Sequence, residues 1–260
     1  MSFEAILRRE RLIIGGCLAA IVLIAWSYLL HSKMMMANMD MGSMDMAGMV
    51  MPEVERWGAA TVFSLFLMWA VMMIGMMLPS AAPMILTFHT LNERRTTSRP
   101  LVPVGIFLLG YIVVWTGYSA VAALAQWGLH KAAFLSSTMV ATSPVLSGGL
   151  LLVAGLFQLT PLKRVCLKGC RSPFSFLMSE WRDGTKGTFV MGVRHGSYCV
   201  GCCWALMTLL FIAGVMNLLW VAIIALFVLA EKILPKGELL APISGVALMA
   251  AGIAFIVRLW

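Results

Sequence analysis

The sequence predicts an all-α integral membrane protein, a polytopic bundle of about seven transmembrane helices. Hydrophobic residues make up 61% of its 260 residues and charged residues only 12%, whereas soluble domains have about 45–50% and about 25%. The apolar residues also form long uninterrupted blocks, as a bilayer crossing of about 20 residues requires. In such a protein the net charge of +8 indicates basic cytoplasmic loops. We therefore expect a lipid bilayer around the chain and no nucleic-acid partner.

Seven apolar segments are predicted to span the membrane, and two of them are short. The fourth and the sixth fall below the usual length of about 20 residues. The first follows Arg8, Arg9 and Arg11 but is too long for a signal peptide and lacks a small-residue cleavage site, so we interpret it as a retained helix. The segments are residues 12–30, 59–88, 101–125, 145–159, 197–215, 218–230 and 241–257.

The distribution of Lys and Arg predicts the orientation. With the N-terminus in the cytoplasm and the C-terminus outside, most of the 19 basic residues fall on the cytoplasmic side, as the positive-inside rule requires. We expect two parts: residues 1–58, a transmembrane helix with an external methionine-rich loop, and residues 59–260, a six-helix membrane domain that binds metal.

The predicted external loop, residues 34–51, reads MMMANMDMGSMDMAGMVM and holds nine methionines in eighteen residues. Thioethers are soft ligands that select Cu(I) over hard cations, and acidic neighbours attract a cation. The alternatives are a linker of biased composition or an interfacial segment that dips into lipid. The predicted copper ligands here are Met39, Met41, Met44 and Met46.

A second group of methionines lies inside the second predicted span, in WAVMMIGMMLPSAAPM. Pro79 and Pro83 follow and free backbone carbonyls near the middle of the helix. Thioethers beside such a kink are suited to passing Cu(I) from site to site, although methionine is also an ordinary gap-filler in apolar packing. The predicted relay consists of Met72, Met73, Met76 and Met77.

The strongest ligand pattern is RHGSYCVGCCWALM, at the start of the fifth predicted span. His195, Cys199, Cys202 and Cys203 occupy positions i, i+4, i+7 and i+8, so a helix places them on one face. Cys166 and Cys170, in CLKGC, are four apart on the same predicted side of the membrane and share a face if that segment is helical. Thiolates suit Cu(I), Zn(II) or an iron–sulfur cluster. Inert packing and dithiol redox chemistry at the Cys199–Cys202 pair are the alternatives.

Three further residues carry weaker expectations. His89, at the end of the second span, is a candidate ligand. Glu231, beside Lys232 near the interface, is a candidate for an ion pair or a functional carboxylate. Cys17 is expected to pack within the first helix.

Four strings resemble a bacterial family of predicted metal-binding integral membrane proteins: MMIGMMLPSAAPM, PLKRVCLKGCRSPF, RHGSYCVGCCWALM and FIAGVMNLLWVAIIALFVLAEK. The resemblance runs from about Ala59 to the C-terminus and leaves the methionine loop outside. It implies a multi-span helical protein of the bacterial inner (cytoplasmic) membrane with a copper-chaperone or copper-transport role. The residues that match its motifs are Cys166, Cys170, His195, Cys199, Cys202 and Cys203.

These observations favour a membrane copper-handling protein that binds Cu(I) through Met, Cys and His and transfers or transports it. The alternatives are an accessory subunit that delivers copper to a membrane metalloenzyme, a thiol oxidoreductase, or a structural Zn(II) protein. The expected partners are a membrane copper enzyme or a copper chaperone. The sequence has no P-loop pattern and no evident nucleophile–base pair, so we do not expect an enzyme.

Overall fold

The computed structural model describes residues 3–44, 58–95, 101–132 and 143–257, and all of its regular elements are helices. This confirms the all-α prediction for the described residues. The elements are α1 (Phe3–Met44), α2 (Ala59–Arg95), α3 (Leu101–Lys131), α4 (Pro144–Leu159), α5 (Pro161–Arg171), α6 (Pro173–Glu180), α7 (Gly184–Met207), α8 (Leu210–Ala213), α9 (Leu218–Ile233), the 3-10 turn η1 (Gly237–Leu239) and α10 (Leu240–Val257).

Among the described residues, five helical stretches are long and apolar enough to cross a membrane. They lie in α1, α2, α3, α7 with α8, and η1 with α10; α4 and α5, bent by 66° at Thr160, make a sixth if they form one span. α9 has 16 residues, short of the length that a bilayer crossing needs. The count of seven and the orientation of the termini stay predictions.

Two sequence-based boundaries are wrong. α1 continues through Met34 to Met44, so this part of the expected loop is helical, because methionine and alanine are good helix formers and the first glycine comes only at Gly42. α7 begins at Gly184 rather than at residue 197, and no proline interrupts residues 184–207.

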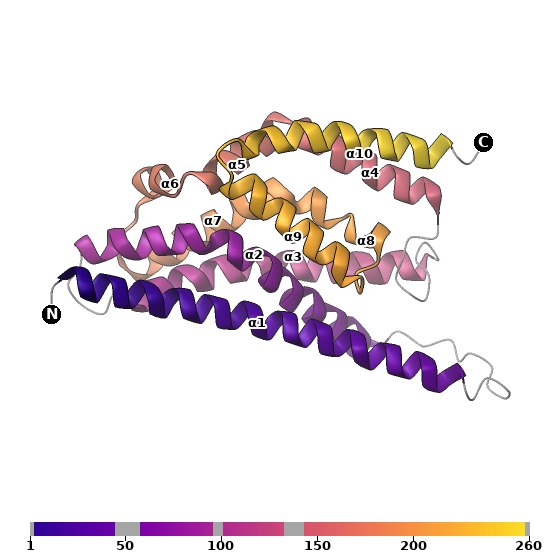
Figure 1. Cartoon of the computed structure of the whole chain (residues 1–260), viewed down its shortest axis with the longest axis horizontal. Helices are drawn as coiled ribbons and strands as arrows, with labels where there is room; N and C mark the ends of the chain where they lie inside the picture. The colour runs from indigo at the N-terminus through magenta and orange to yellow at the C-terminus, as the bar shows by residue number, and fades with distance from the viewer. Residues whose placement is uncertain (1–2, 45–57, 96–100, 133–142, 258–260) are drawn as a thin grey trace.

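α2 lies at the centre of the bundle, where it packs against α1, α3 and α9. In Figure 1, α1 runs along the lower edge of the molecule beside α2, while α4 and α10 lie side by side along the upper edge. α2 is apolar all round, as expected for a helix inside a bundle. Its methionine-bearing face is buried. α2 therefore carries its thioethers into the interior.

α3 and α7 cross at very close range because two glycines face each other. A Cβ on Gly192 would lie 2.1 Å from the carbonyl oxygen of Phe107, and a Cβ on Gly110 would lie 2.4 Å from that of Phe189. Small residues allow helix backbones to approach in this way. The crossing places Tyr111, which follows Gly110, against the cysteine face of α7.

A buried ion pair ties α5 to α9. Lys163 Nζ donates to Glu231 Oε2 at 2.7 Å, and both side chains are at most 1% exposed. Gln158 of α4 donates to the other carboxylate oxygen at 3.2 Å. Glu231 is thus a structural pairing residue. The pair holds α5, with its two cysteines, in place.

Candidate metal centre

Three cysteines in the C-terminal half of α7 point into the protein interior. Cys199, Cys202 and Cys203 are each at most 1% exposed. The Sγ atoms of Cys202 and Cys203 lie 3.1 and 2.9 Å from the carbonyl oxygen of Cys199, to which they donate. The predicted shared face is confirmed for these three cysteines.

Cys166 and Cys170 lie in helix α5 and share a face because they are four residues apart. α5 packs against α7. Cys170 Sγ lies 4.0 Å from Cys202 Sγ. Gly201 makes room for the other thiol, because a Cβ there would lie 2.9 Å from Cys166 Sγ. All six cysteines are free.

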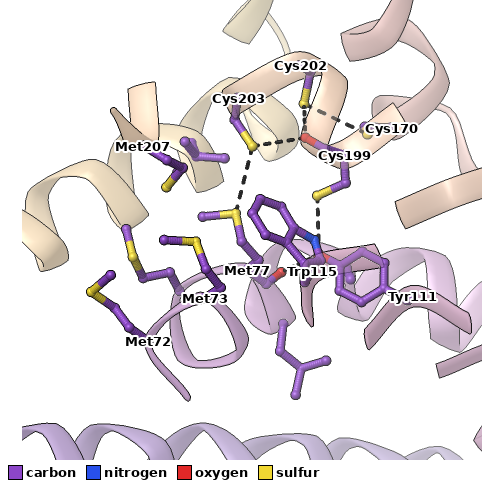
Figure 2. Close-up of a cluster of buried hydrophobic side chains, with 14 of the residues drawn as sticks. Met72, Met73, Met77, Tyr111, Trp115, Cys170, Cys199, Cys202, Cys203 and Met207 are labelled. Atoms are coloured by element: carbon purple, nitrogen blue, oxygen red, sulfur yellow. Dashed lines mark hydrogen bonds between the residues drawn. The ribbon is translucent and has the colours of Figure 1, made fainter. Parts of the chain in front are cut away.

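The thioethers of α2 meet the same cysteines from the opposite side. Met77 Sδ lies 4.0 Å from Cys203 Sγ, and Figure 2 shows Met73 and Met77 side by side beneath Cys203. Met72, Met73 and Met77 are 0% exposed and Met76 is 2% exposed. We call Cys170, Cys199, Cys202, Cys203 and Met77 the sulfur core, and the four methionines of α2 the methionine face.

The spacing of the sulfur core suits a metal ion between pairs of sulfurs. Two sulfurs bound at about 2.3 Å to one trigonal or tetrahedral ion are roughly 4 Å apart, and both pairs above are 4.0 Å apart. Among the described residues, no three thiol or imidazole ligands of this face lie within 4.8 Å of one another. A site with three thiols therefore requires side-chain rotation toward the ion.

A buried cation and a phenol, which the sequence analysis did not single out as part of the site, touch Cys199. Lys232 Nζ lies 2.9 Å from Cys199 Sγ and donates to Ser80 Oγ at 2.9 Å. Tyr111 Oη lies 3.2 Å from the same thiol and 3.2 Å from the carbonyl oxygen of Met77. The only sequence feature that pointed to Lys232 as part of the site was its position directly after an apolar segment.

His195 lies on the same α7 face but among aromatic rings. Its imidazole is 2% exposed and is 5.5 Å from the ring of Tyr111, 6.0 Å from that of Phe107 and 5.6 Å from that of Phe176, between centroids. Its Nδ1 is buried without a hydrogen-bond partner. The imidazole therefore stacks on Tyr111, which contacts Cys199 of the sulfur core. Its Nδ1 atom is available for a ligand.

The other predicted residues divide into three groups. Met39, Met41 and Met44 belong to α1, distant in sequence from the sulfur core, while Met46 lies outside the described residues. Cys17 is exposed on α1, so the expectation that it packs is wrong: it falls on the outward face of that helix. His89 does not end its helix, since α2 continues to Arg95.

Comparison with known proteins identifies the family. A family model described as the copper chaperone PpoB2 matches residues 66–255, which is more than half of the chain and includes the whole sulfur core. No curated protein and no solved structure matched. The predicted copper-related membrane family is confirmed, with a start at residue 66 rather than 59. The chain therefore belongs to the PpoB2 copper-chaperone family, whose matched region contains every thiol and thioether of the buried centre.

Proposed function

We propose that the protein binds Cu(I) in the sulfur core and passes it on within the bilayer. The observation that carries this proposal is the convergence of three helices on one buried centre. α7 supplies three thiols, α5 supplies Cys170 and α2 supplies Met77, with two sulfur pairs 4.0 Å apart. Membership of a copper-chaperone family supports copper as the metal that the protein carries.

The ligand chemistry favours Cu(I) over Zn(II) and Cu(II). Thiolates and thioethers are soft and suit Cu(I), and the sulfur core as defined contains no carboxylate of the kind that harder ions prefer. Zn(II) accepts thiolates and imidazole but gains little from the methionine face. Two thiolates and Cu(I) carry one net negative charge, which the Lys232 ammonium beside Cys199 balances.

The methionine face supports a route to the thiols. It follows α2 and meets the sulfur core where Met77 contacts Cys203. Thioethers are neutral ligands, so Cu(I) moves along them without proton release, and the protons leave only when thiols bind. We propose capture by the methionines of residues 34–51 outside, passage along α2, and storage at the cysteines.

Delivery completes the proposed role. A chaperone hands its ion to a partner, so we propose a membrane copper enzyme or a second copper chaperone as the recipient and the bacterial inner membrane as the location. The N-in, C-out orientation and a non-enzymatic role belong to this proposal. Handover requires opening of the bundle, because the core thiols are at most 6% exposed.

The test is Cu(I) binding by the purified protein in detergent under reducing conditions, in competition with a colorimetric Cu(I) chelator. We expect tight binding by the wild type and its loss in the Cys199→Ser, Cys202→Ser, Cys203→Ser triple variant. Cys17→Ser is the matched control, since Cys17 is exposed on α1. Absorption spectroscopy at the copper edge should show sulfur neighbours. Equal binding by the triple variant and the control would refute the proposal.

A second measurement separates storage from passage. Met72→Leu, Met73→Leu and Met76→Leu together keep the buried volume but remove three thioethers, and a further variant lacks residues 34–51. We expect both to retain Cu(I) stoichiometry and to load more slowly from a Cu(I) donor. Unchanged loading rates would reject the route along the methionines.

A further inference from the structure

A second group of ligand atoms lies at the end of the bundle where α1 begins and α2 ends (Figure 1, near the N label). His89 Nε2 is 3.4 Å from Glu10 Oε2 and 3.6 Å from Glu93 Oε2. The ligand atoms of these three residues all lie within 4.8 Å of one another, and no other such group of His, Cys, Asp and Glu occurs in the described ranges. We call Glu10, His89 and Glu93 the carboxylate–imidazole trio.

The trio is largely buried, and four of its polar atoms have no hydrogen-bond partner. The side chain of His89 is 0% exposed, that of Glu93 8% and that of Glu10 19%. Both ring nitrogens of His89 and one oxygen of each carboxylate are buried without a hydrogen-bond partner. Buried polar atoms in native proteins are almost always partnered, so four such atoms in one place require a further partner, either a metal ion or water.

The distances suit a metal ion better than direct hydrogen bonds. A charge-assisted N–H···O contact is about 2.7–2.9 Å long, well below the 3.4 and 3.6 Å found here. Two ligands bound at about 2.0–2.1 Å to a tetrahedral ion are roughly 3.4 Å apart. His89 Nε2 faces both carboxylates, so the three atoms surround a position that a cation would fill.

The nearest basic residue of α1 does not occupy that position. Arg11 Nη2 donates to Thr90 Oγ1 at 2.9 Å, which fastens α1 to α2 and directs the guanidinium to Thr90. Two ionised carboxylates together carry charge −2, which the nearby Arg11 guanidinium offsets only in part. α1 thus closes a site whose excess of negative charge favours a bound cation.

We propose that Glu10, His89 and Glu93 bind a divalent transition-metal ion of borderline hardness, with Zn(II) as the probe. Imidazole suits Zn, Cu, Fe and Ni, and carboxylates suit harder ions, so this set disfavours Cu(I). Three protein ligands leave one coordination position open. Glu10 lies outside residues 66–255, which the copper-chaperone family model matches, so the family match does not include the complete trio, and this proposal does not depend on the proposed Cu(I) function.

The test is Zn(II) binding to the full-length, reduced protein in detergent, by equilibrium dialysis and zinc-edge absorption spectroscopy. We expect one Zn(II) with nitrogen and oxygen neighbours. Glu10→Gln, His89→Gln and Glu93→Gln should each weaken that ion by at least about tenfold, since even residues that merely support metal ligands change affinity by about 10–100-fold. His31→Gln, an exposed histidine of α1, is the matched control.

Two readouts distinguish loss of the Zn(II) site from misfolding of a variant and from Zn(II) binding at the sulfur core. Zn(II) should raise the melting temperature of the wild type and not that of Glu10→Gln, a near-isosteric change at the most exposed member of the trio. Cu(I) binding should be equal in all variants, so failure of the sulfur core would appear separately. Equal Zn(II) affinity in variants and control, or zinc with sulfur neighbours only, would overturn the proposal.

Discussion

The sulfur core and the carboxylate–imidazole trio are both buried ligand groups, but they differ in chemistry and in construction. The core joins thiols and a thioether from α5, α7 and α2, and the trio joins an imidazole and two carboxylates from α2 and α1. α2 contributes to both groups, through Met77 and through His89 with Glu93. One helix thus presents soft ligands at mid-length and harder ligands at its end, and if both proposals hold, a single scaffold separates cations by ligand softness.

The two groups also depend on different supports. The core relies on the buried Lys163–Glu231 pair and on the close α3–α7 crossing, whereas the trio relies on the packing of α1 along α2. Substitutions at the supports of the core should therefore change Cu(I) binding without affecting Zn(II) at the trio.

The largest effect is expected from Lys163→Leu. The change leaves the Glu231 carboxylate buried and unpaired, which typically costs about 3–5 kcal/mol, and it frees α5 with Cys170 from α9. Unfolding measured by circular dichroism in detergent should shift strongly, and Cu(I) affinity should fall more than Zn(II) affinity. Lys168→Leu, at an exposed position of the same helix, should change neither. Matching stability of the two variants would show that the ion pair does not hold α5.

Lys232→Gln should weaken Cu(I) binding by about 10–100-fold. A hydrogen bond to a charged group contributes about 1.5–3 kcal/mol, and each 1.4 kcal/mol is a factor of about ten. The change removes the cation 2.9 Å from Cys199 Sγ, and chelator competition measures the result. Lys236→Gln, at an exposed position, is the control. A Cu(I) affinity unchanged in Lys232→Gln would remove the ammonium from the proposed site.

Gly192→Ala should destabilise the protein by about 1–3 kcal/mol, the usual cost of overpacking. The new Cβ would lie 2.1 Å from the carbonyl oxygen of Phe107, so α3 and α7 must separate and Tyr111 must move from Cys199. Gly117→Ala, in α3 with nothing within 4 Å of its Cβ position, should instead stabilise by about 0.5–1 kcal/mol. Thermal unfolding of both variants tests the crossing, and a shift of the same sign in both would contradict it.

The smallest effect is expected from Tyr111→Phe, which removes a hydroxyl 3.2 Å from Cys199 Sγ. Tyr118→Phe removes a matched hydroxyl of α3, which donates to the carbonyl oxygen of Trp204 in α7 at 3.2 Å. Each should cost about 1 kcal/mol of stability. Only Tyr111→Phe should also weaken Cu(I) binding, by about fivefold. The same Cu(I) affinity in both variants would exclude Tyr111 from the site.

The helical class was predictable from the length of the apolar segments, and the cysteine face was predictable from local periodicity. Positions i, i+4, i+7 and i+8 share a face in any α-helix, so Cys199, Cys202 and Cys203 fall together whatever packs against them. The helical loop at residues 34–44 was missed because the density of methionines was interpreted as a ligand signal rather than as helix propensity. The composition of residues 34–44 alone did not distinguish a copper-binding loop from a helix.

The sequence by itself therefore determined that the chain is helical, with segments long and apolar enough to cross a membrane, and which thiols share one face. Only the tertiary structure decided that Met77, Lys232 and Tyr111 meet those thiols, and that Glu10 closes on His89 across 79 residues of chain. The physical reason is that side-chain faces follow from the pitch of a single helix, whereas contacts between helices depend on crossing angles and close approach, which here are set by glycines and buried ion pairs far apart in sequence.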